Sequence, residues 1–221
     1  MKKTSRPIHD IKTAADQTVE KIFSAARAEF AENGYSGSRM ERIARRAGVN
    51  KATLYYQIGD KDTLYAGVIH QVLGGIAGEI AQAVFQRERP EEKLTAYIET
   101  IAEAARKHPE LPSIMMREIA SDGAHLPRVV VEDVASVLTL LIGILDDGRK
   151  KGRFAEVPFF LVHSMIMGTI LFYEKAAPIK DRQVWLPETV KRKDATLKGS
   201  TGQEVAKLVL KAIGKDSGGK R

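Results

Sequence analysis

One short segment of the chain gathers the side chains that bind phosphates and the edges of bases. Lysine and arginine contact phosphate as cations, and lysine also reaches a guanine edge. Hydroxyl and amide side chains hydrogen-bond to phosphate, and tyrosine can also touch a thymine methyl group. Between residues 38 and 56 the candidates are Ser38, Arg39, Asn50, Lys51, Thr53, Tyr55 and Tyr56, while Arg42, Arg45 and Arg46 belong either to the same surface or to a solvated face. Their chemistry suits contact with nucleic acid if one surface presents them together.

Two short helices are predicted to position this set. The first spans residues 38–47, where Ser38 and Glu41 form a capping box, and the second spans 50–57 with Asn50 as its N-cap. Gly48 supplies the tight turn between them. These are the proportions of a helix-turn-helix, whose second helix lies in the major groove while the first crosses the backbone. Two short helices with a glycine turn also occur as plain packing units, so the geometry alone leaves both interpretations open.

The residues around the two helices narrow this choice. The matching positions are Val19, Ile22, Phe23, Ala25, Ala26, Phe30, Gly34, Tyr35, Ile43, Ala44, Ala47, Gly48, Val49, Thr53, Leu54, Tyr55, Tyr56, Lys61, Asp62 and Leu64. This pattern, over about residues 17–66, closely resembles the DNA-binding domain of the TetR (tetracycline repressor) family. One departure is Ile58, where the family commonly has an aromatic residue.

The resemblance implies roles for individual residues. In the family the second short helix supplies base and phosphate contacts, which here correspond to Lys51, Thr53, Tyr55 and Tyr56. Lys61 occupies the position of a phosphate-contacting lysine. The resemblance further implies a sequence-specific transcriptional regulator, a repressor that binds a palindromic operator as a homodimer and is released by a ligand. A non-specific or architectural DNA-binding protein is the alternative, and a helical enzyme is a more remote one.

The rest of the sequence also predicts helices and no convincing strand, so the expected fold class is all-α. A first helix is expected over residues 14–33, and Asp60 is expected to cap a helix that carries Leu64, Val68 and Val72. Further helices are predicted at 91–107, 112–122, 127–151, 157–176 and 201–213. We expect two domains, a basic arm with the DNA-binding domain at 1–62 and a larger effector-binding and dimerisation domain at 63–221.

The resemblance also implies that the last two long helices form the dimer interface. Small residues on one helix and an apolar stripe on the other fit this role, namely Leu161, Ser164, Gly168, Leu171, Val205, Leu208, Val209 and Ala212. Packing of the same faces within one chain is the alternative.

An effector pocket is expected among the central helices, again from the resemblance. Its candidates are methionine and aromatic residues with one histidine, which suit a small apolar ligand: Tyr97, Met115, Met116, Phe160, His163 and Met167. An ordinary hydrophobic core is the competing interpretation. Three glycines, Gly74, Gly75 and Gly78, interrupt the preceding helix and predict either a hinge or a close helix crossing.

Charge and composition exclude several classes of protein. The 221 residues carry a formal net charge of +7, with +4 in residues 1–65, −3 in 66–189 and +6 in 190–221. The absence of cysteine excludes disulfides, zinc ribbons and a thiol nucleophile. Common catalytic and nucleotide-binding motifs are missing, so we expect no enzyme, no cofactor and no metal site. The longest uncharged run, 157–173, is shorter than a membrane span, so we expect a buried helix there and a cytoplasmic protein.

Overall fold

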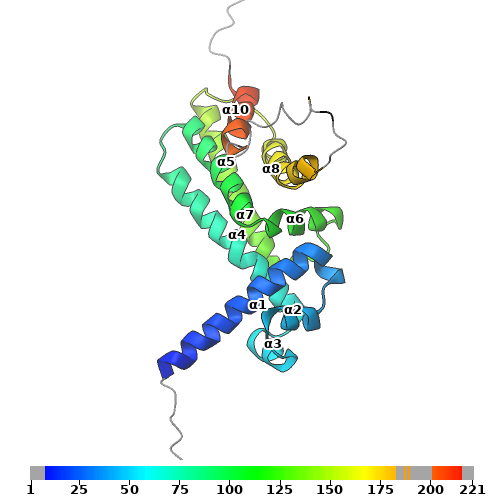
Figure 1. Ribbon diagram of the computed structural model, residues 1–221. Coiled ribbons are helices and arrows are strands. Elements are labelled where there is room, and N and C mark those ends of the chain that lie inside the picture. Colours follow the sequence, from blue (N-terminus) through cyan, green and yellow to red (C-terminus); the bar gives the residue numbers. More distant parts are fainter. Residues whose placement is uncertain (1–7, 183–186, 188, 190–200, 216–221) are drawn as a thin grey trace, which may run out of the picture. The chain divides into compact units, whose positions relative to one another are not determined.

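The computed structural model describes residues 8–182, 187, 189 and 201–215. Regular structure in this part of the chain is helical, without a strand, and one isolated bridge pairs Phe154 with Gly214. The helices are α1 (Ile8–Gly37), α2 (Met40–Ala47), α3 (Lys51–Ile58), α4 (Lys61–Phe85), α5 (Pro90–Lys107), α6 (Glu110–Ala120), α7 (Arg128–Lys150), α8 (Phe159–Arg182) and α10 (Thr201–Ile213) (Figure 1). The predicted all-α class is confirmed.

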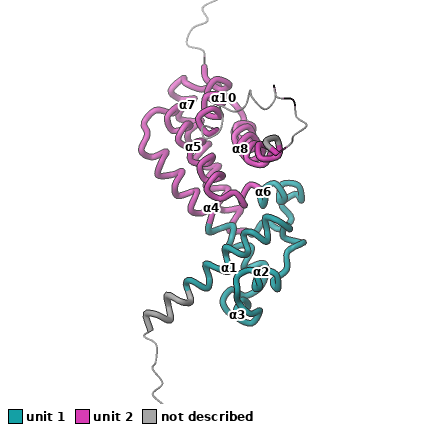
Figure 2. Tube along the Cα trace, viewed as in Figure 1, with its two compact units in different colours: residues 1–71, 113–127 teal, residues 72–112, 128–221 magenta. Residues whose placement is uncertain are grey.

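The chain divides into two compact units, and two helices contribute to both (Figure 2). Unit 1 comprises Met1–Gln71 and Ser113–Pro127, and unit 2 comprises Val72–Pro112 and Arg128–Arg221. The division therefore falls within α4 and within α6. A sequence-based boundary at residue 62 lies at the start of α4, and nothing in the local sequence signals that residues 113–127 join the N-terminal unit.

In unit 1, local capping residues set the ends of the short helices. Gly48 adopts a left-handed conformation (φ 68°, ψ 29°) and ends α2, as its position in the sequence predicts. The side chain of Asn50 accepts a hydrogen bond from the backbone N–H of Thr53 at 2.7 Å and begins α3. Asp60 accepts one from the N–H of Thr63 at 2.8 Å before α4. These three predicted caps are confirmed.

Two predictions about this region are wrong. The first helix begins at Ile8 rather than near Ala14, and it is assigned through a kink at Gly34 (φ 67°, ψ 177°). Ser38 does not cap α2, because Arg39 occupies the N-cap position without a side-chain hydrogen bond. Instead the Ser38 hydroxyl donates to the carbonyl oxygens of Gly34 (2.5 Å) and Glu29 (3.2 Å). Because this side chain is buried beside α1, its hydroxyl is taken up by carbonyl groups of α1 and is not available to the first turn of α2.

Helix α4 carries the apolar face that the sequence predicts. Leu64, Val68 and Val72 on this face are buried. By length and composition, α4 is the one helix in the described part that could cross a membrane, and core helices of soluble proteins also meet that criterion. Among the described residues a Cβ atom added at Gly75 or Gly78 would have no neighbour within 4 Å, so these two glycines mark no close helix crossing there, and the hinge stays a prediction.

Unit 2 is organised around α5, whose residues Leu94, Tyr97 and Ile98 have no exposed surface. Helix α10 approaches α5 closely at Gly202, where a Cβ atom would lie 3.0 Å from both the Glu99 Cα and the Ala102 Cβ. A side chain at this position would require α5 or α10 to shift. The described part of unit 2 thus has a core of its own.

Helix α8 departs from the expectation of a buried helix. Val162, Ile166 and Ile170 are buried along one side. The opposite side exposes large apolar side chains, including Phe172 at 65%. The helix also continues past the predicted end at 176 to Arg182, with Pro178 inside it. A run without charges therefore marked a helix with two apolar sides, of which unit 2 covers one.

Candidate DNA-binding site

Helix α3 projects most of its predicted contact residues outward. Leu54 is fully buried and fixes the rotation of the helix against the rest of unit 1. Tyr56 is consequently 87% exposed and Tyr55 42% exposed, with Lys51 also exposed and Thr53 half-buried. The predicted set from Asn50 to Tyr56 is thus brought together on one short, capped helix.

Lys51 does not stand alone on this surface. Its ammonium group forms an ion pair with the carboxylate of Glu41 on α2, and it lies 5.7 Å from the centre of the Tyr55 ring. The hydrogen bond from Lys51 lowers the pKa of Glu41, and the same bond raises the pKa of Lys51. Both partners are exposed, so solvent weakens the pair and a DNA phosphate can replace the carboxylate.

The arginines of α2 divide into two groups. Arg42 donates to the buried carboxylate of Glu29 at 2.6 Å, and Arg46 pairs with Glu32 at 2.6 Å, which ties α2 to α1. Arg39 and Arg45 are exposed and have no carboxylate within ion-pair distance in the described part of the chain. The first group positions the helix, and the second leaves its charge available.

The Lys61 ammonium group lies over an aromatic ring. Its Nζ atom lies 4.3 Å from the centre of the Tyr35 ring, and partial burial lowers its pKa. Among the described residues Lys61 forms no ion pair, although the nearby carboxylates of Asp62 and Glu29 favour its charged form. This agrees with the role that the family resemblance implies.

Ser38 does not fit the contact role that its position implies. Its side chain is only 4% exposed and its hydroxyl is used by two carbonyl groups of α1. We therefore correct the assignment of Ser38 to a structural one, while Arg39, next to it, is exposed. The basic arm with Lys2, Lys3 and Arg6 lies outside the described residues, as does the end of the basic tail from residue 216.

The sequence did not predict the contacts that residues 113–127 make within unit 1. The buried carboxylate of Glu118 accepts a hydrogen bond from the Tyr65 hydroxyl, and the His125 ring stacks on Tyr35 with centroids 4.6 Å apart. Arg117 donates to the carbonyl oxygen of Glu32 at 2.9 Å. No short-range pattern links these residues to positions that precede them by 50 or more.

The predicted effector residues do not form one group. Met115 and Met116 belong to unit 1, and the other four belong to unit 2. Phe160 is 62% exposed, which conflicts with its prediction as a pocket-lining residue, because Val162, two residues further on, takes the buried side of α8. Tyr97 is fully buried, and neither its Oη nor the buried Nδ1 of His163 has a hydrogen-bond partner in the described structure.

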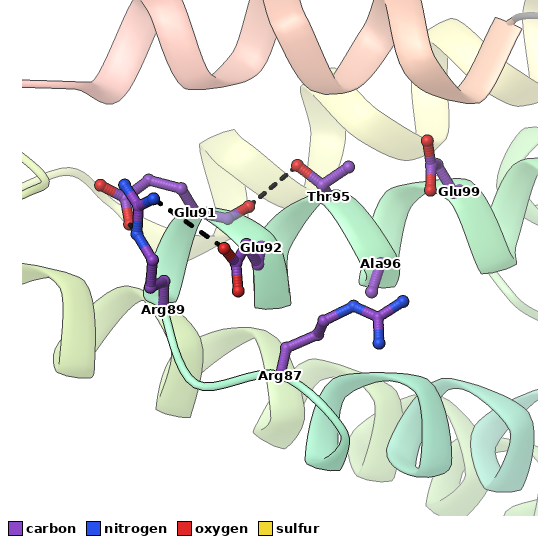
Figure 3. Close-up of a pocket in the computed structure, with 7 residues that line it drawn as sticks. All are labelled: Arg87, Arg89, Glu91, Glu92, Thr95, Ala96 and Glu99. Carbon is purple, nitrogen blue, oxygen red and sulfur yellow. Dashed lines mark hydrogen bonds and ion pairs between the residues drawn. The ribbon is translucent and has the colours of Figure 1, made fainter.

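An open groove of about 350 Å³ lies beside the first turns of α5, and it contains none of these candidates (Figure 3). Its lining is mostly charged and consists of Arg87, Arg89, Glu91, Glu92, Thr95, Ala96 and Glu99. Arg153 forms an ion pair with Glu91, while Arg89 approaches Glu92 at 3.9 Å. A surface with this mixture of charges does not suit an apolar ligand. Among the described residues no cluster could hold a metal ion.

The residues predicted at a dimer interface also separate into two sets. Leu171, Val205 and Val209 are buried within unit 2, so their assignment to an interface is wrong. Val205 and Val209 lie on the side of α10 that packs within this unit, which is the intramolecular alternative. The remaining residues are exposed and belong to α8 and α10: Leu161, Ser164, Gly168, Leu208 and Ala212.

Comparison with known proteins supports the assignment from the site. Residues 22–68 match the family model of bacterial regulatory proteins of the tetR family, and residues 90–180 match a tetracyclin repressor-like C-terminal domain. Together the two models cover more than half of the chain.

Individual relatives agree with these matches. The transcriptional repressor NicS of Pseudomonas putida is 26% identical over 72% of this chain and 76% of its own length. The transcriptional regulator RutR of Escherichia coli O157:H7 is 26% identical over 87% and 88%. The crystal structure of FadR from Bacillus subtilis in complex with stearoyl-CoA has the same fold, with a TM-score of 0.67 and 24% identity over 88% of this chain and 98% of FadR. The chain belongs to the TetR family of transcriptional regulators, which are DNA-binding proteins rather than enzymes.

Proposed function

We propose that this protein is a transcriptional repressor that binds a palindromic operator as a homodimer and leaves it when a small-molecule effector binds. The observation that carries the proposal is the exposure of Lys51, Tyr55 and Tyr56 on a helix whose rotation is fixed by the buried Leu54. A rigid second helix with donors on its free face is what major-groove recognition requires.

The contacts can be assigned by chemistry. Lys51 binds a guanine edge or a phosphate, and Tyr56 donates to phosphate or packs against a thymine methyl group. Lys61 and Arg39 bind phosphates and so help to set the position of α3 on the duplex. Asn50 and Thr53, at the start of the same helix, complete the surface.

Exposed apolar side chains support the homodimer. Leu161, Met165, Gly168 and Phe172 recur at i, i+4, i+7 and i+11 along α8, and all four are exposed. Leu208 of α10, a helix in contact with α8, is 64% exposed. A second copy that covers this surface would place two helix-turn-helix motifs on one operator, and a palindromic site is the expected consequence.

Two unpartnered polar atoms in unit 2 support an effector with an apolar body and a polar group. Burial lowers the pKa of His163, so its imidazole is neutral at pH 7, and the neutral Tyr97 hydroxyl is fully buried. Neither the Tyr97 Oη nor the His163 Nδ1 has a partner among the described residues, and a buried polar atom is costly without one. Met167, four residues after His163 on α8, is the candidate for an adaptable apolar contact. FadR, one of the similar folds, binds stearoyl-CoA, a ligand that combines both kinds of surface.

A protein that binds operator DNA in this way works where bacterial DNA is, so we propose a cytoplasmic location.

The test of function is selection of the preferred duplex from a random pool, followed by competition against random DNA. We expect a palindromic consensus and a preference of about a thousandfold or more over random sequence. An architectural DNA-binding protein would give no consensus and an affinity governed by salt alone, and this outcome would overturn the proposal.

A further inference from the structure

The Tyr35 ring contacts two side chains from distant parts of the sequence within unit 1, namely His125 and Lys61. The His125 ring lies against the Tyr35 ring with an interplanar angle of 27° and a centroid distance of 4.6 Å. The Nζ atom of Lys61 lies 4.3 Å from the centre of the same Tyr35 ring. Through these two contacts, Tyr35 connects the segment after α6 to the first residue of α4.

We propose that His125 is a positioning residue for DNA binding, which holds Lys61 in place through Tyr35. This inference rests on the proposed contact between Lys61 and an operator phosphate. It assigns a role in DNA binding to a residue that lies far from the helix-turn-helix in the sequence and makes no DNA contact itself.

The Tyr35 ring is suited to transmit a position because its orientation is fixed at several points. Its hydroxyl donates a hydrogen bond to the carboxylate of Asp62, the residue after Lys61. The buried Tyr65 ring meets it edge-on at 5.0 Å with an angle of 64°. With these two contacts made, His125 covers a face of the ring, and loss of the imidazole would let the ring shift away from Lys61.

His125 is in turn held by hydrogen-bond contacts with Glu118 and Ser36. Its backbone N–H donates to Glu118 Oε2 at 3.3 Å, and its Nε2 lies 3.3 Å from the Ser36 hydroxyl. Glu118 is itself held by the Tyr65 hydroxyl at 2.5 Å. The turn that carries His125 includes Asp122 and Gly123, both with positive φ, so its path is specific rather than extended.

A lysine held over a ring has less side-chain freedom to lose when it binds phosphate. A flexible lysine loses this entropy on binding, whereas a pre-positioned lysine loses less. The stack therefore raises operator affinity without adding a contact to the DNA.

The test is a double-mutant cycle on operator affinity, measured as a function of salt with the full-length dimer. Lys61→Ala is expected to weaken binding about tenfold and to reduce the slope of log K against log salt by about 1. His125→Ala is expected to weaken binding roughly two- to fivefold and to move the slope toward the Lys61→Ala value. In the Lys61→Ala background, His125→Ala should cause no further loss.

Conservative variants separate positioning from folding. His125→Phe keeps an aromatic ring on Tyr35 and should bind within about twofold of the wild type, whereas His125→Gln keeps a polar group near Ser36 without a ring and should bind as weakly as His125→Ala. His108→Ala in unit 2 is the control and should leave affinity and slope unchanged. Additive losses from His125→Ala and Lys61→Ala, or a His125→Gln variant that binds normally, would overturn the inference. If Lys61→Ala itself changes neither affinity nor slope, the proposed phosphate contact is the part that fails.

Discussion

The hydroxyl of Tyr65 on α4 donates a hydrogen bond to the carboxylate of Glu118 on α6, with 2.5 Å between Oη and Oε1. Both side chains are almost completely buried, at 1% and 2% exposure. A buried carboxylate needs donors, and Glu118 obtains them from Tyr65 and from the backbone N–H of His125. This pair fixes the end of α6 to the helices of unit 1.

Replacement of Tyr65 by phenylalanine should therefore destabilise the protein without changing its surface. The substitution removes one donor from a buried carboxylate, and we expect the free energy of unfolding to fall by about 1–3 kcal/mol. Urea denaturation at pH 7 measures the change. Tyr56→Phe removes an exposed hydroxyl and is the matched control, which should stay within about 0.5 kcal/mol of the wild type. Equal stability of the two variants would contradict the structural role of the Tyr65–Glu118 pair.

High pH should weaken the fold through Tyr35. Its hydrogen bond to the Asp62 carboxylate, followed by burial, raises its pKa to about 12 from the ordinary value of 10.0. Since the folded protein favours the protonated phenol, this contribution to stability is complete below pH 10 and is lost as the pH rises from about 10 to about 12. The stability difference between wild type and Tyr35→Phe, measured by urea midpoints, should shrink across that interval. A difference that stays constant from pH 9 to pH 12 would show that the phenol does not titrate with the fold.

Local rules predicted the parts of the fold that local interactions determine. Gly48, Asn50 and Asp60 act over three or four residues, and all three caps are where the sequence places them. Ser38 has the same kind of signature but lies beside the end of α1, so tertiary contacts take its hydroxyl. A helix cap can be predicted from neighbouring residues in the sequence only when no other buried group competes for the hydrogen bond of the capping side chain.

Long-range packing determines which apolar residues are buried, and no local sequence pattern predicts this. Val209 and Leu208 are adjacent and equally apolar, yet Val209 is 2% exposed and Leu208 64%. Which side of α10 faces inward depends on α5 and on the close approach at Gly202. In the same way, His125 reaches Tyr35 across 90 residues of sequence, and no periodicity in either segment indicates the contact.

Two substitutions on α3 should affect operator binding in different ways. Lys51→Ala removes a cation and should reduce the slope of log K against log salt concentration by about 1. It should also weaken binding to DNA. Tyr56→Ala removes a neutral group and should weaken binding while the slope stays the same. Fluorescence anisotropy over a range of salt concentrations separates the two effects. Lys107→Ala, an exposed lysine at the end of α5, is the control and should bind normally. Identical slopes for Lys51→Ala and the wild type would rule out a phosphate contact by Lys51.

A charge on the exposed apolar side of α8 should separate the proposed dimer. Phe172 is 65% exposed in one chain, and Phe172→Glu would place a carboxylate in the interface without disturbing the core of unit 2. Sedimentation velocity should show a shift from dimer to monomer, and affinity for a palindromic operator should fall with it. Phe85→Glu is the control, because it makes the same change at a side chain that is 90% exposed on α4. This variant should sediment as the same oligomer as the wild type. A Phe172→Glu variant that stays dimeric would place the interface elsewhere.

Gly148 and Gly143 on α7 provide a test of packing in unit 2 within a single helix. A Cβ atom at Gly148 would lie 2.7 Å from the Phe154 Cγ and closer still to two other ring carbons. Phe154 cannot easily move away, because its ring is 1% exposed and the N–H of the next residue, Ala155, donates to the Ile213 carbonyl at 2.8 Å. We therefore expect Gly148→Ala to lower the free energy of unfolding by about 1–3 kcal/mol or more, as overpacked cores do.

At Gly143 the same substitution meets no atom within 4 Å. Alanine should there stabilise the protein by about 0.5–1 kcal/mol, since it restricts the unfolded chain and favours the helix. Urea denaturation of the two variants should thus give changes of opposite sign, although both add one methyl group to α7. If Gly148→Ala were as stable as Gly143→Ala, the Phe154 ring would have another place to pack. The segment that follows α7 would then not be anchored by the packing of Phe154 against Gly148.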